Sequence, residues 1–388
     1  MKFVRVLLLL SLALPGAASA TMRIFEPPPS YVAPPGQAPI ALLVDQSSGQ
    51  ILYSRGANAD FLPASMTKAM TALIVFDLIK AGELDEDTLV SIRPETAARW
   101  AGKGTTLNLR AEERVRIGDL LMGTTVVSAN DASVALAEAS LGSTEAFVAA
   151  MNARARGLGM TRSRFGTPSG FPDRGVTVVT ATDLILLANA LITEHPELYR
   201  RYIGKAAMDW RGAKLTSHDP FAGVLVGADG IKTGHTYEAG FNFLGTAVRD
   251  GRRLVVVIGR SPTEPGRAAA ARNLIEWGFA AFQSKPFLTP DWIVGAVKVQ
   301  NGDAREVPVA VPHAYSIATI KRLPSQVSAR IVYDGPVRAP ITKGAPIARL
   351  VVSGAGLPDH SIPLVATASV SRAGPIDRLV NALLGLFA

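Results

Sequence analysis

The sequence contains no cysteine, so neither thiol catalysis nor a cysteine-ligated metal is available to it, and an oxidising compartment offers it no disulfide. Its five histidines are dispersed, without His-Glu-x-x-His or another zinc spacing. The 40 basic and 32 acidic residues give a net charge of +8, which suits an anionic surface, but the basic residues form no stripe with interleaved aromatics. We therefore expect no metal, no cofactor and no nucleic-acid partner.

The first 20 residues have the pattern of a secretory signal. A positively charged start is followed by a short apolar run and by Ala18-Ser19-Ala20, which provides small residues at a cleavage point. The run is too short to span a bilayer, and Pro15 and Gly16 break it, which disfavours an uncleaved anchor. We expect an exported chain in which residues 21–39, rich in proline, form an extended leader.

Residues 40–284 have the pattern of an α+β domain with helices in the middle and antiparallel strands at both sequence ends. Strands that open and close a domain in this way are expected to lie in one sheet. The expected strands are Ala41–Asp45, Gln50–Ser54, Phe241–Val248 and Arg252–Gly259. The expected helical stretches are Ser65–Ala81, Arg116–Gly157 and about Arg267–Phe279.

Residues 285–373 change to valine-rich runs broken by proline and glycine, which predicts a second domain, a small all-β sandwich. No cluster of residues in it has a catalytic pattern. Its expected strands are Ile293–Val299, Val307–Val311, Ser316–Ile320, Ala329–Val332, Ala348–Val352 and Pro363–Ala366.

The last residues, 374–388, predict an amphipathic helix. Apolar residues recur at steps of three and four from Ile376 to Phe387, with polar side chains elsewhere. The stretch is too short to cross a bilayer, so we expect it to lie on an anionic membrane surface, with Arg372 and Arg378 near the headgroups. Docking of the same helix on its own domain is the alternative.

Three short motifs carry the chemistry of the sequence: Ser65-Met66-Thr67-Lys68, Ser128-Ala129-Asn130 and Lys232-Thr233-Gly234. Each alone is weak, because a serine before a helix is commonly an N-cap, Ser-x-Asn is commonly a turn, and Lys-Thr-Gly is commonly a strand end. Their occurrence together, in this order, is typical of serine enzymes that recognise penicillin.

The spacing of the first motif places a base beside a nucleophile. With Ser65 at the start of a helix, Lys68 lies one turn on and on the same face. Lys68 can accept the serine proton if burial or a positive charge such as Lys232 lowers its pKa. The backbone N–H groups of Ser65 and His235 are the expected oxyanion hole. We assign His235 only this backbone role, because the Gly-x-Ser-x-Gly signature of a Ser-His-Asp hydrolase is absent.

Over residues 37–282 the chain resembles the low-molecular-mass penicillin-binding proteins, specifically the serine-type D-alanyl-D-alanine carboxypeptidases. The likeness is carried by Pro63–Lys68, Ser128–Ala132, Asp229–Thr236 and Ala239–Asn242. It continues more loosely through the β-rich region and the terminal helix. The resemblance implies a penicillin-binding-protein/β-lactamase-like catalytic domain, a peptidoglycan pentapeptide as substrate, β-lactam antibiotics as inhibitors, and a place on the periplasmic face of the cytoplasmic membrane.

The resemblance also implies roles in acylation for four residues. Ser65 would form the acyl-enzyme and Lys68 would be its general base. Ser128 would relay a proton to the leaving amine, and Asn130 would hold the amide of the substrate.

The remaining residues of the implied site bind the other end of the substrate. Lys232 and Thr233, followed by Gly234 and His235, would lie near its terminal carboxylate. Arg267 stands where the family's carboxylate-binding arginine falls. A solvent-exposed position for Arg267 at the start of a helix is the alternative.

Several enzymes use the same nucleophile. A β-lactamase needs a further carboxylate for deacylation, and Glu145, Glu194 and Glu197 all lack the Glu-x-x-Leu-Asn setting that this role requires. We therefore expect penicillin to be trapped and not turned over. A D,D-endopeptidase acting on cross-linked peptidoglycan uses the same residues, and an inactive wall-binding scaffold is an alternative of a different class.

Overall fold

The computed structural model describes residues 38–290, 292–321, 327–354 and 357–374. The chain divides into two compact units, one made of residues 38–46 and 51–280, and the other made of the chain from Ala281 onward together with Ser47–Gln50. The predicted signal sequence, nearly all of the proline-rich leader and the predicted C-terminal helix lie outside the described residues.

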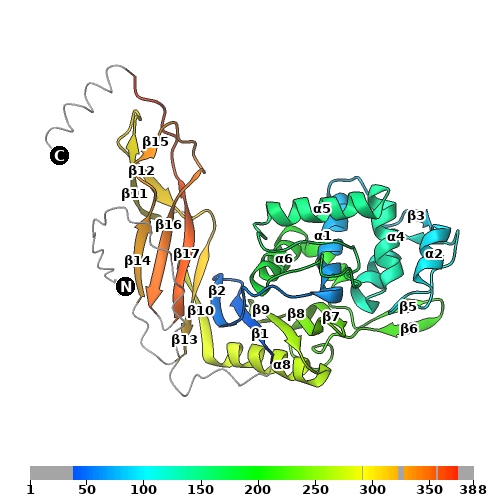
Figure 1. The fold of residues 1–388 in the computed structure, drawn as a ribbon. Coiled ribbons are helices and arrows are strands. Elements are labelled where there is room, and N and C mark those ends of the chain that lie inside the picture. Colours follow the sequence, from blue (N-terminus) through cyan, green and yellow to red (C-terminus); the bar gives the residue numbers. More distant parts are fainter. Residues whose placement is uncertain (1–37, 291, 322–326, 355–356, 375–388) are drawn as a thin grey trace. The chain divides into compact units, whose positions relative to one another are not determined.

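The first unit is built on a five-stranded sheet in the order β2-β1-β9-β8-β7 (Figure 1). We predicted that the strands at the two sequence ends of the domain lie in one sheet, and this is confirmed. β1 pairs with β9 along its whole length, with Ile40 opposite Gly259 and Asp45 opposite Leu254. The strands are β1 (Ile40–Asp45), β2 (Gln50–Arg55), β7 (Ala228–Thr236), β8 (Gly240–Arg249) and β9 (Arg252–Ser261).

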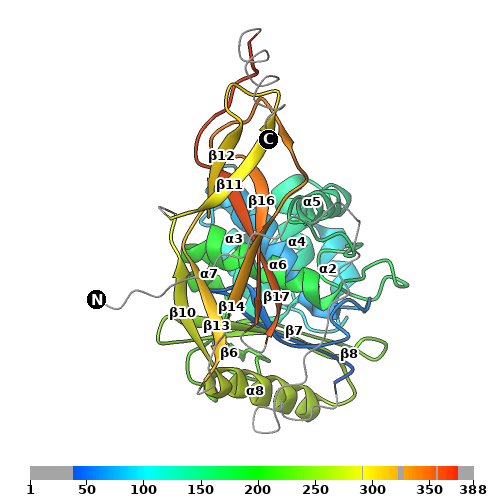
Figure 2. The same ribbon diagram turned by 90° about the vertical axis from the view of Figure 1, so that its left-hand side faces the viewer.

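Both faces of this sheet are buried, which explains why β1 is a continuous apolar run. Leu42 and Val44 point into the main hydrophobic core on the helical face. Leu43 points to the opposite face, where α8 (Glu264–Ala281) covers the sheet (Figures 1 and 2). At Gly278 of α8 a Cβ atom would lie 2.6 Å from Leu43 Cδ2, so the absence of a side chain lets this helix pack closely.

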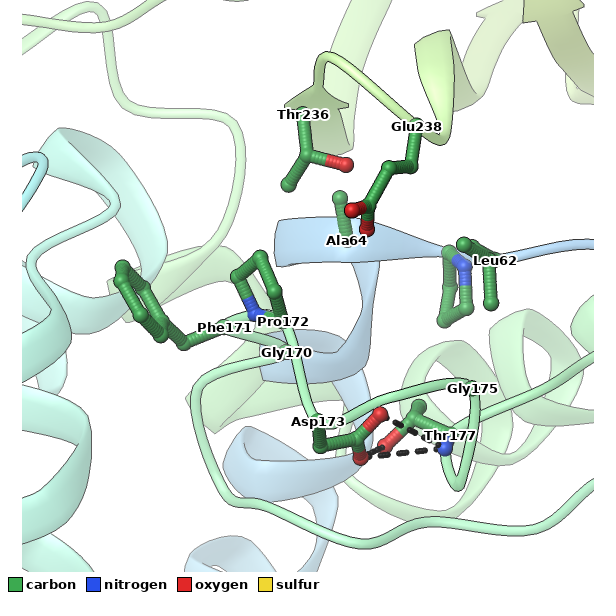
Figure 3. A pocket seen from close by; sticks show the side chains of 11 residues that line it. Leu62, Ala64, Gly170, Phe171, Pro172, Asp173, Gly175, Thr177, Thr236 and Glu238 are labelled. Atoms are coloured by element: carbon green, nitrogen blue, oxygen red, sulfur yellow. Dashed lines mark hydrogen bonds between the residues drawn. The ribbon is translucent and has the colours of Figure 1, made fainter.

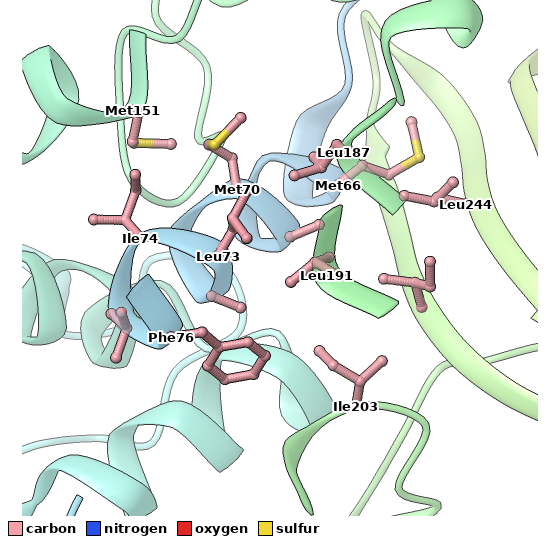
Figure 4. Packing of buried hydrophobic residues seen from close by; sticks show 14 of the residues in the cluster. Met66, Met70, Leu73, Ile74, Phe76, Met151, Leu187, Leu191, Ile203 and Leu244 are labelled. Atoms are coloured by element: carbon pink, nitrogen blue, oxygen red, sulfur yellow. The ribbon is translucent and has the colours of Figure 1, made fainter. Parts of the chain in front are cut away.

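The predicted helix at residues 65–81 is present, and its first turn is tighter than an α-helix. Ala64–Thr67 form a 3₁₀-helix, and α1 continues from Lys68–Lys80. Every residue of α1 from Lys68 to Phe76 is buried, so this part of the helix has no solvated face. Figure 4 shows its side chains packed among residues of α5 (Thr144–Gly157), α6 (Ala181–Glu194) and β8.

The helical stretch predicted at residues 116–157 consists of several separate helices. α4 (Asn130–Leu141) is terminated by Gly142, whose φ of +80° is a left-handed value that favours glycine. Ser143 then caps α5 by accepting a hydrogen bond from the backbone N–H of Ala146 at 3.1 Å. The segments are α3 (Ile117–Met122), a π-helix (Gly123–Val127), α4 (Asn130–Leu141) and α5.

Smaller elements complete the first unit. They are α2 (Pro94–Trp100), α7 (Pro196–Tyr202), the pair β3 (Leu89–Ser91) and β4 (Arg114–Arg116), and the pair β5 (Ala207–Trp210) and β6 (Ala213–Thr216). Within the described ranges no single helix has the length and apolar character needed to cross a membrane, and α4 with α5 reach that length only as a pair bent by 86°.

The second unit is all-β, as the sequence predicted. Six strands form one sheet in the order β14-β16-β17-β12-β11-β15, and β10 pairs with β13. Side chains such as Val297, Val309 and Leu364 are fully buried in its own core. The strands are β10 (Phe282–Leu288), β11 (Ile293–Gln300), β12 (Glu306–Ala310), β13 (Tyr315–Ile320), β14 (Val327–Val332), β15 (Val337–Arg338), β16 (Pro346–Gly354) and β17 (Leu357–Ala366).

Candidate active site

The first motif lies at the N-terminal end of the buried helix α1. The turn Ala64–Thr67 is named here the nucleophile turn because it holds Ser65, the predicted nucleophile. It begins with Ala64 at a φ of 49°, which is left-handed and unusual for a residue with a Cβ atom. This change of backbone direction leaves the side chain of Ser65 partly exposed. One turn later, Lys68 Nζ is hydrogen bonded to Ser65 Oγ at 2.9 Å.

Lys68 is completely buried, and its amine has two further partners besides the serine. Nζ donates to Asn130 Oδ1 at 2.8 Å and to the backbone carbonyl of Ser169 at 2.7 Å. Burial holds the pKa of Lys68 well below its usual range, the charge of Lys232 lowers it further, and the carboxylate of Asp131 opposes the shift. A neutral amine has two N–H bonds and one lone pair, so the two carbonyl oxygens take the N–H groups and the lone pair faces the serine hydroxyl.

The loop Thr167–Phe171 supplies the carbonyl of Ser169, and the sequence motifs gave no indication of this contribution. Thr71 in α1 donates to the carbonyl of Pro168, which anchors the loop on the helix. Gly170 has a φ of +69°, and a Cβ atom there would lie 1.9 Å from the carbonyl oxygen of Ala64. The only sequence signal for this contact is the Pro-Ser-Gly turn at residues 168–170.

The second motif lies at a break between two helices. The π-helix Gly123–Val127 leads into Ser128, whose φ is 71°, and α4 begins at Asn130. The carboxylate of Asp131 holds this turn by accepting hydrogen bonds from the backbone N–H groups of Leu107 and Leu109 at 2.9 and 3.1 Å. In the described part of the chain, no hydrogen bond engages Ser128 Oγ, so its hydroxyl is available to a substrate.

Asn130 is engaged at both ends of its amide. Its Oδ1 accepts from Lys68, and its Nδ2 donates to the carbonyl of Lys103 at 3.3 Å. One N–H of Nδ2 therefore remains for the predicted hydrogen bond to the amide of the substrate. The visible function of Asn130 is to orient the amine of Lys68.

The third motif lies on β7, which crosses directly over the nucleophile turn. A Cβ atom at Gly234 would lie 2.2 Å from the carbonyl oxygen of Pro63 and 3.2 Å from the backbone N of Ser65. Glycine is therefore required for the strand to approach the nucleophile this closely. The next residue, His235, has an exposed imidazole that stacks on Phe241 with ring centroids 3.9 Å apart, so its ring lies at the surface.

Two basic side chains from different elements, Lys232 in the middle of β7 and Arg267 in α8, act on each other's charge. Lys232 is 5% exposed, and burial lowers its pKa to about 7; the carboxylate of Asp219 opposes this shift and the guanidinium of Arg267 adds to it. Arg267, in the first turns of α8, is 3% exposed, so the surface position considered for it is wrong. It donates to Glu264 at 3.0 Å, and its buried Nε has no hydrogen-bond partner in the described residues.

One group of possible metal ligands lies elsewhere, at the C-terminal end of α1. Asp77, Glu194 and His195 place one ligand atom each within 4.8 Å of the others. Arg154 occupies this position, because its guanidinium pairs with Asp77 at 2.8 Å and also with Glu194. His195 Nε2 lies 2.7 Å from the other oxygen of Asp77. The positive charge that the two carboxylates require therefore comes from the chain itself.

Comparison with known proteins identifies the chemistry of this arrangement. The family model of the D-alanyl-D-alanine carboxypeptidases, peptidase S11, matches residues 30–262. The chain belongs to this family. The model of the C-terminal domain of penicillin-binding protein 5 matches residues 282–372, which contain the all-β unit. This D-alanyl-D-alanine carboxypeptidase is thus a serine hydrolase acting on peptidoglycan peptides.

Relatives resemble the carboxypeptidase over nearly its full length. The D-alanyl-D-alanine carboxypeptidase DacA of Haemophilus influenzae is 31% identical over 89% of both chains, and DacD of Salmonella typhimurium is 30% identical over 96% of this chain and 95% of that protein. The solved structure of penicillin-binding protein 5 from Haemophilus influenzae has a TM-score of 0.76 and 30% identity, and covers 87% of this chain and 99% of that one. Neither the endopeptidase nor the scaffold alternative gains support from these relatives.

Replacing Gly234 tests the close approach of β7 to the nucleophile turn. We expect Gly234→Ala to lower the rate of D-alanine release by about 100-fold, because a displacement of about 1 Å in a catalytic group has that effect. The variant should keep the circular dichroism and thermal transition of a folded protein. Gly157→Ala is the matched control, since a Cβ atom there meets nothing within 4 Å. Equal turnover by both variants would show that the approach is not needed.

The pH dependence of the reaction should report the charge on Lys232. We expect protonated Lys232 to bind the terminal carboxylate of the substrate. Because burial lowers its pKa to about 7, kcat/KM should fall as the pH rises through about 7. A bound carboxylate favours the protonated form of Lys232, so kcat should fall less than kcat/KM over the same pH range. Steady-state kinetics from roughly pH 6 to 9 measure both. A kcat/KM that stays constant across this range would remove Lys232 from carboxylate binding.

Proposed function

We propose that Ser65 is the nucleophile that removes the terminal D-alanine, with Lys68 as its general base. The observation that carries this assignment is the set of three contacts around Lys68 Nζ, which direct the lone pair of a neutral amine at Ser65 Oγ. Burial and the charge of Lys232 lower the pKa of this amine, which favours the neutral form that can accept a proton.

The reaction then takes place in two steps. Ser65 Oγ attacks the carbonyl carbon of the penultimate D-alanine as its proton passes to Lys68 Nζ, and the developing oxyanion is held by the backbone N–H groups of Ser65 and His235. Collapse of the tetrahedral intermediate breaks the peptide bond, and the proton held by Lys68 passes through Ser128 to the leaving amine of D-alanine. Water then hydrolyses the ester on Ser65, which releases the shortened peptide and restores the hydroxyl.

The leaving D-alanine keeps its free carboxylate beside Lys232, Thr233 and Arg267. The buried, unpartnered Nε of Arg267 supports this orientation, because a planar guanidinium matches a carboxylate with two parallel hydrogen bonds. A peptide that lacks the free carboxylate leaves these buried donors unsatisfied.

The same serine is the expected target of β-lactams. The penicillin-binding protein D2 of Listeria monocytogenes, solved in an ampicillin-bound form, is similar at 32% identity with a TM-score of 0.57, and covers 63% of this chain and 98% of that one. In the present chain Glu194 is paired with Arg154 and Glu145 is fully exposed at the start of α5. Neither carboxylate is placed to activate water at Ser65, so the acyl-enzyme with penicillin should persist.

Ser65→Ala and an amidated substrate together test the proposal. We expect Ser65→Ala to abolish both D-alanine release and labelling by a fluorescent penicillin without loss of fold, because one hydroxyl is removed from an ordered site. The wild-type enzyme should cleave a peptide with an amidated C-terminus far more slowly than the free acid. Labelling of Ser65→Ala at another residue would overturn the nucleophile, and equal cleavage of the two peptides would favour an endopeptidase.

We also propose that the enzyme is exported and held on the periplasmic face of the cytoplasmic membrane by residues 376–388. The secretory pattern of residues 1–20 and the one-sided apolar pattern of Ile376–Phe387 support this proposal. Deleting residues 376–388 should release soluble, penicillin-reactive protein in a membrane sedimentation assay. Unchanged sedimentation, or unfolding of the all-β unit, would favour docking of this segment on the protein.

A further inference from the structure

The hollow beside the nucleophile turn (Figure 3) is part of the active site, and a second surface feature is found in the all-β unit, a group of exposed arginines at one of its ends. The hairpin between β11 and β12, the short strand β15 and the last described residues of the chain come together there (Figure 1). Gln300, at the end of β11, is paired with Arg338 of β15. Gly302, in the hairpin turn, is paired with Arg372. Segments far apart in the sequence thus place arginines side by side.

Three arginines at this end, Arg305, Arg338 and Arg372, are exposed and are named here the arginine collar. Arg305 belongs to the same hairpin, because its carbonyl accepts a hydrogen bond from the backbone N–H of Val299 at 2.7 Å. In the part of the chain that the structure describes, none of the three guanidinium groups forms an ion pair or a hydrogen bond. The donors of all three are therefore available to a ligand.

The carboxylates of the same three segments do not cancel this charge. Glu306 lies directly opposite Lys298 in the β11–β12 pair, so these two charges offset one another. Asp303 accepts a hydrogen bond from the backbone N–H of Ser371 at 3.0 Å, which ties the hairpin to the end of the chain. One carboxylate thus remains against the three arginines of the collar, and this end of the all-β unit has an excess of positive charge.

The chain leaves the all-β unit within the collar. The backbone N–H of Ala373 donates to the carbonyl of Asn301 at 2.9 Å, so the chain is fixed against the hairpin up to this residue. The one-sided apolar pattern begins three residues later, at Ile376. Three extended residues reach at most about 11 Å, which is close to the Debye length of about 8 to 10 Å over which charges act in physiological salt. A membrane that takes up Ile376–Phe387 must therefore come within electrostatic range of the collar.

We propose that the arginine collar binds the phosphate groups of anionic lipids, so that the all-β unit itself contacts the membrane surface beside the C-terminal segment. This inference rests on the membrane location proposed above. A guanidinium group binds phosphate through paired hydrogen bonds, and the three arginines break no ion pair with a described residue when they do so. The attraction adds to the burial of the apolar residues of 376–388, because the binding of an interfacial helix depends on both terms.

Sedimentation with lipid vesicles tests the collar in the full chain. The wild-type protein should bind vesicles that contain phosphatidylglycerol more tightly than vesicles of phosphatidylcholine alone, and the difference should shrink at high salt. Combining Arg305→Gln, Arg338→Gln and Arg372→Gln should weaken binding to the anionic vesicles by about fivefold for each arginine, or about 100-fold together. Binding to phosphatidylcholine alone should not change, because the collar has no charge to contact there.

The matched control combines Lys285→Gln, Arg330→Gln and Arg349→Gln. These changes remove the same charge from exposed positions on β10, β14 and β16 of the same unit, and should largely keep the wild-type preference for anionic vesicles. Both triple variants should keep the thermal transition and the penicillin labelling of the wild type, because every replaced side chain is exposed and lies outside the active site.

Three results would overturn the collar. The first is a collar variant that retains the wild-type preference for anionic vesicles. The second is an equal loss of that preference in the control, which would assign it to net charge alone. The third is unchanged vesicle binding by a collar variant that no longer binds isolated peptidoglycan, which would assign the arginines to a wall polymer. Failure of the proposed anchor would appear separately, because deletion of residues 376–388 would then leave binding to phosphatidylcholine vesicles unchanged.

Discussion

The site depends on a lysine amine that is completely buried at the N-terminal end of a helix. An ammonium group is costly to bury, and the neutral amine is the form that burial favours. Around Lys68 the cost is limited because two carbonyl oxygens accept its N–H groups. The same two contacts orient the remaining lone pair toward Ser65. One local arrangement thus both lowers the pKa of the proposed base and directs its lone pair.

That arrangement requires backbone segments to approach the nucleophile turn without side chains between them. Gly170 meets the carbonyl of Ala64 from one side, and Gly234 meets the carbonyl of Pro63 from the other. Each glycine brings a functional backbone group with it: the carbonyl of Ser169 on the loop, and the N–H of His235 on the strand. The nucleophile turn is therefore confined between two segments that are far apart in the sequence, and this confinement stabilises the left-handed φ of Ala64.

Charge is distributed along β7 in a way that gives the cleft a direction. Lys232, influenced by the buried Arg267 of α8, lies in the middle of the strand, and the carboxylate of Glu238 follows its end. The mutual repulsion of the two cations is moderated by Asp219, whose own pKa is raised by burial. A peptide with a free terminal carboxylate would complement the cationic end of this cleft. Electrostatic matching of this kind contributes to orientation more than to affinity.

The sequence by itself determined the elements whose signals are local. The strands of the five-stranded sheet that it predicted alternate between two buried faces, and the Ser-x-x-Lys spacing placed a base one turn from a nucleophile, because a helix repeats every 3.6 residues. The all-β character of the second unit followed in the same way from its short valine-rich runs. The order of the three motifs was enough to identify the family.

The tertiary structure decided what depends on contacts between distant segments. The carbonyl of Ser169 reaches Lys68 from 101 residues away, and nothing in Thr-Pro-Ser-Gly distinguishes that loop from an ordinary turn. Burial of Arg267 depends on the packing of α8 against the sheet, so its sequence allowed a surface position equally well. Asn130 was assigned to the substrate, and the packing adds a hydrogen bond from Lys68 to its amide oxygen. Local pattern specifies secondary structure and spacing along the chain, whereas burial, and with it pKa and hydrogen-bond partners, is set only when the segments are packed together.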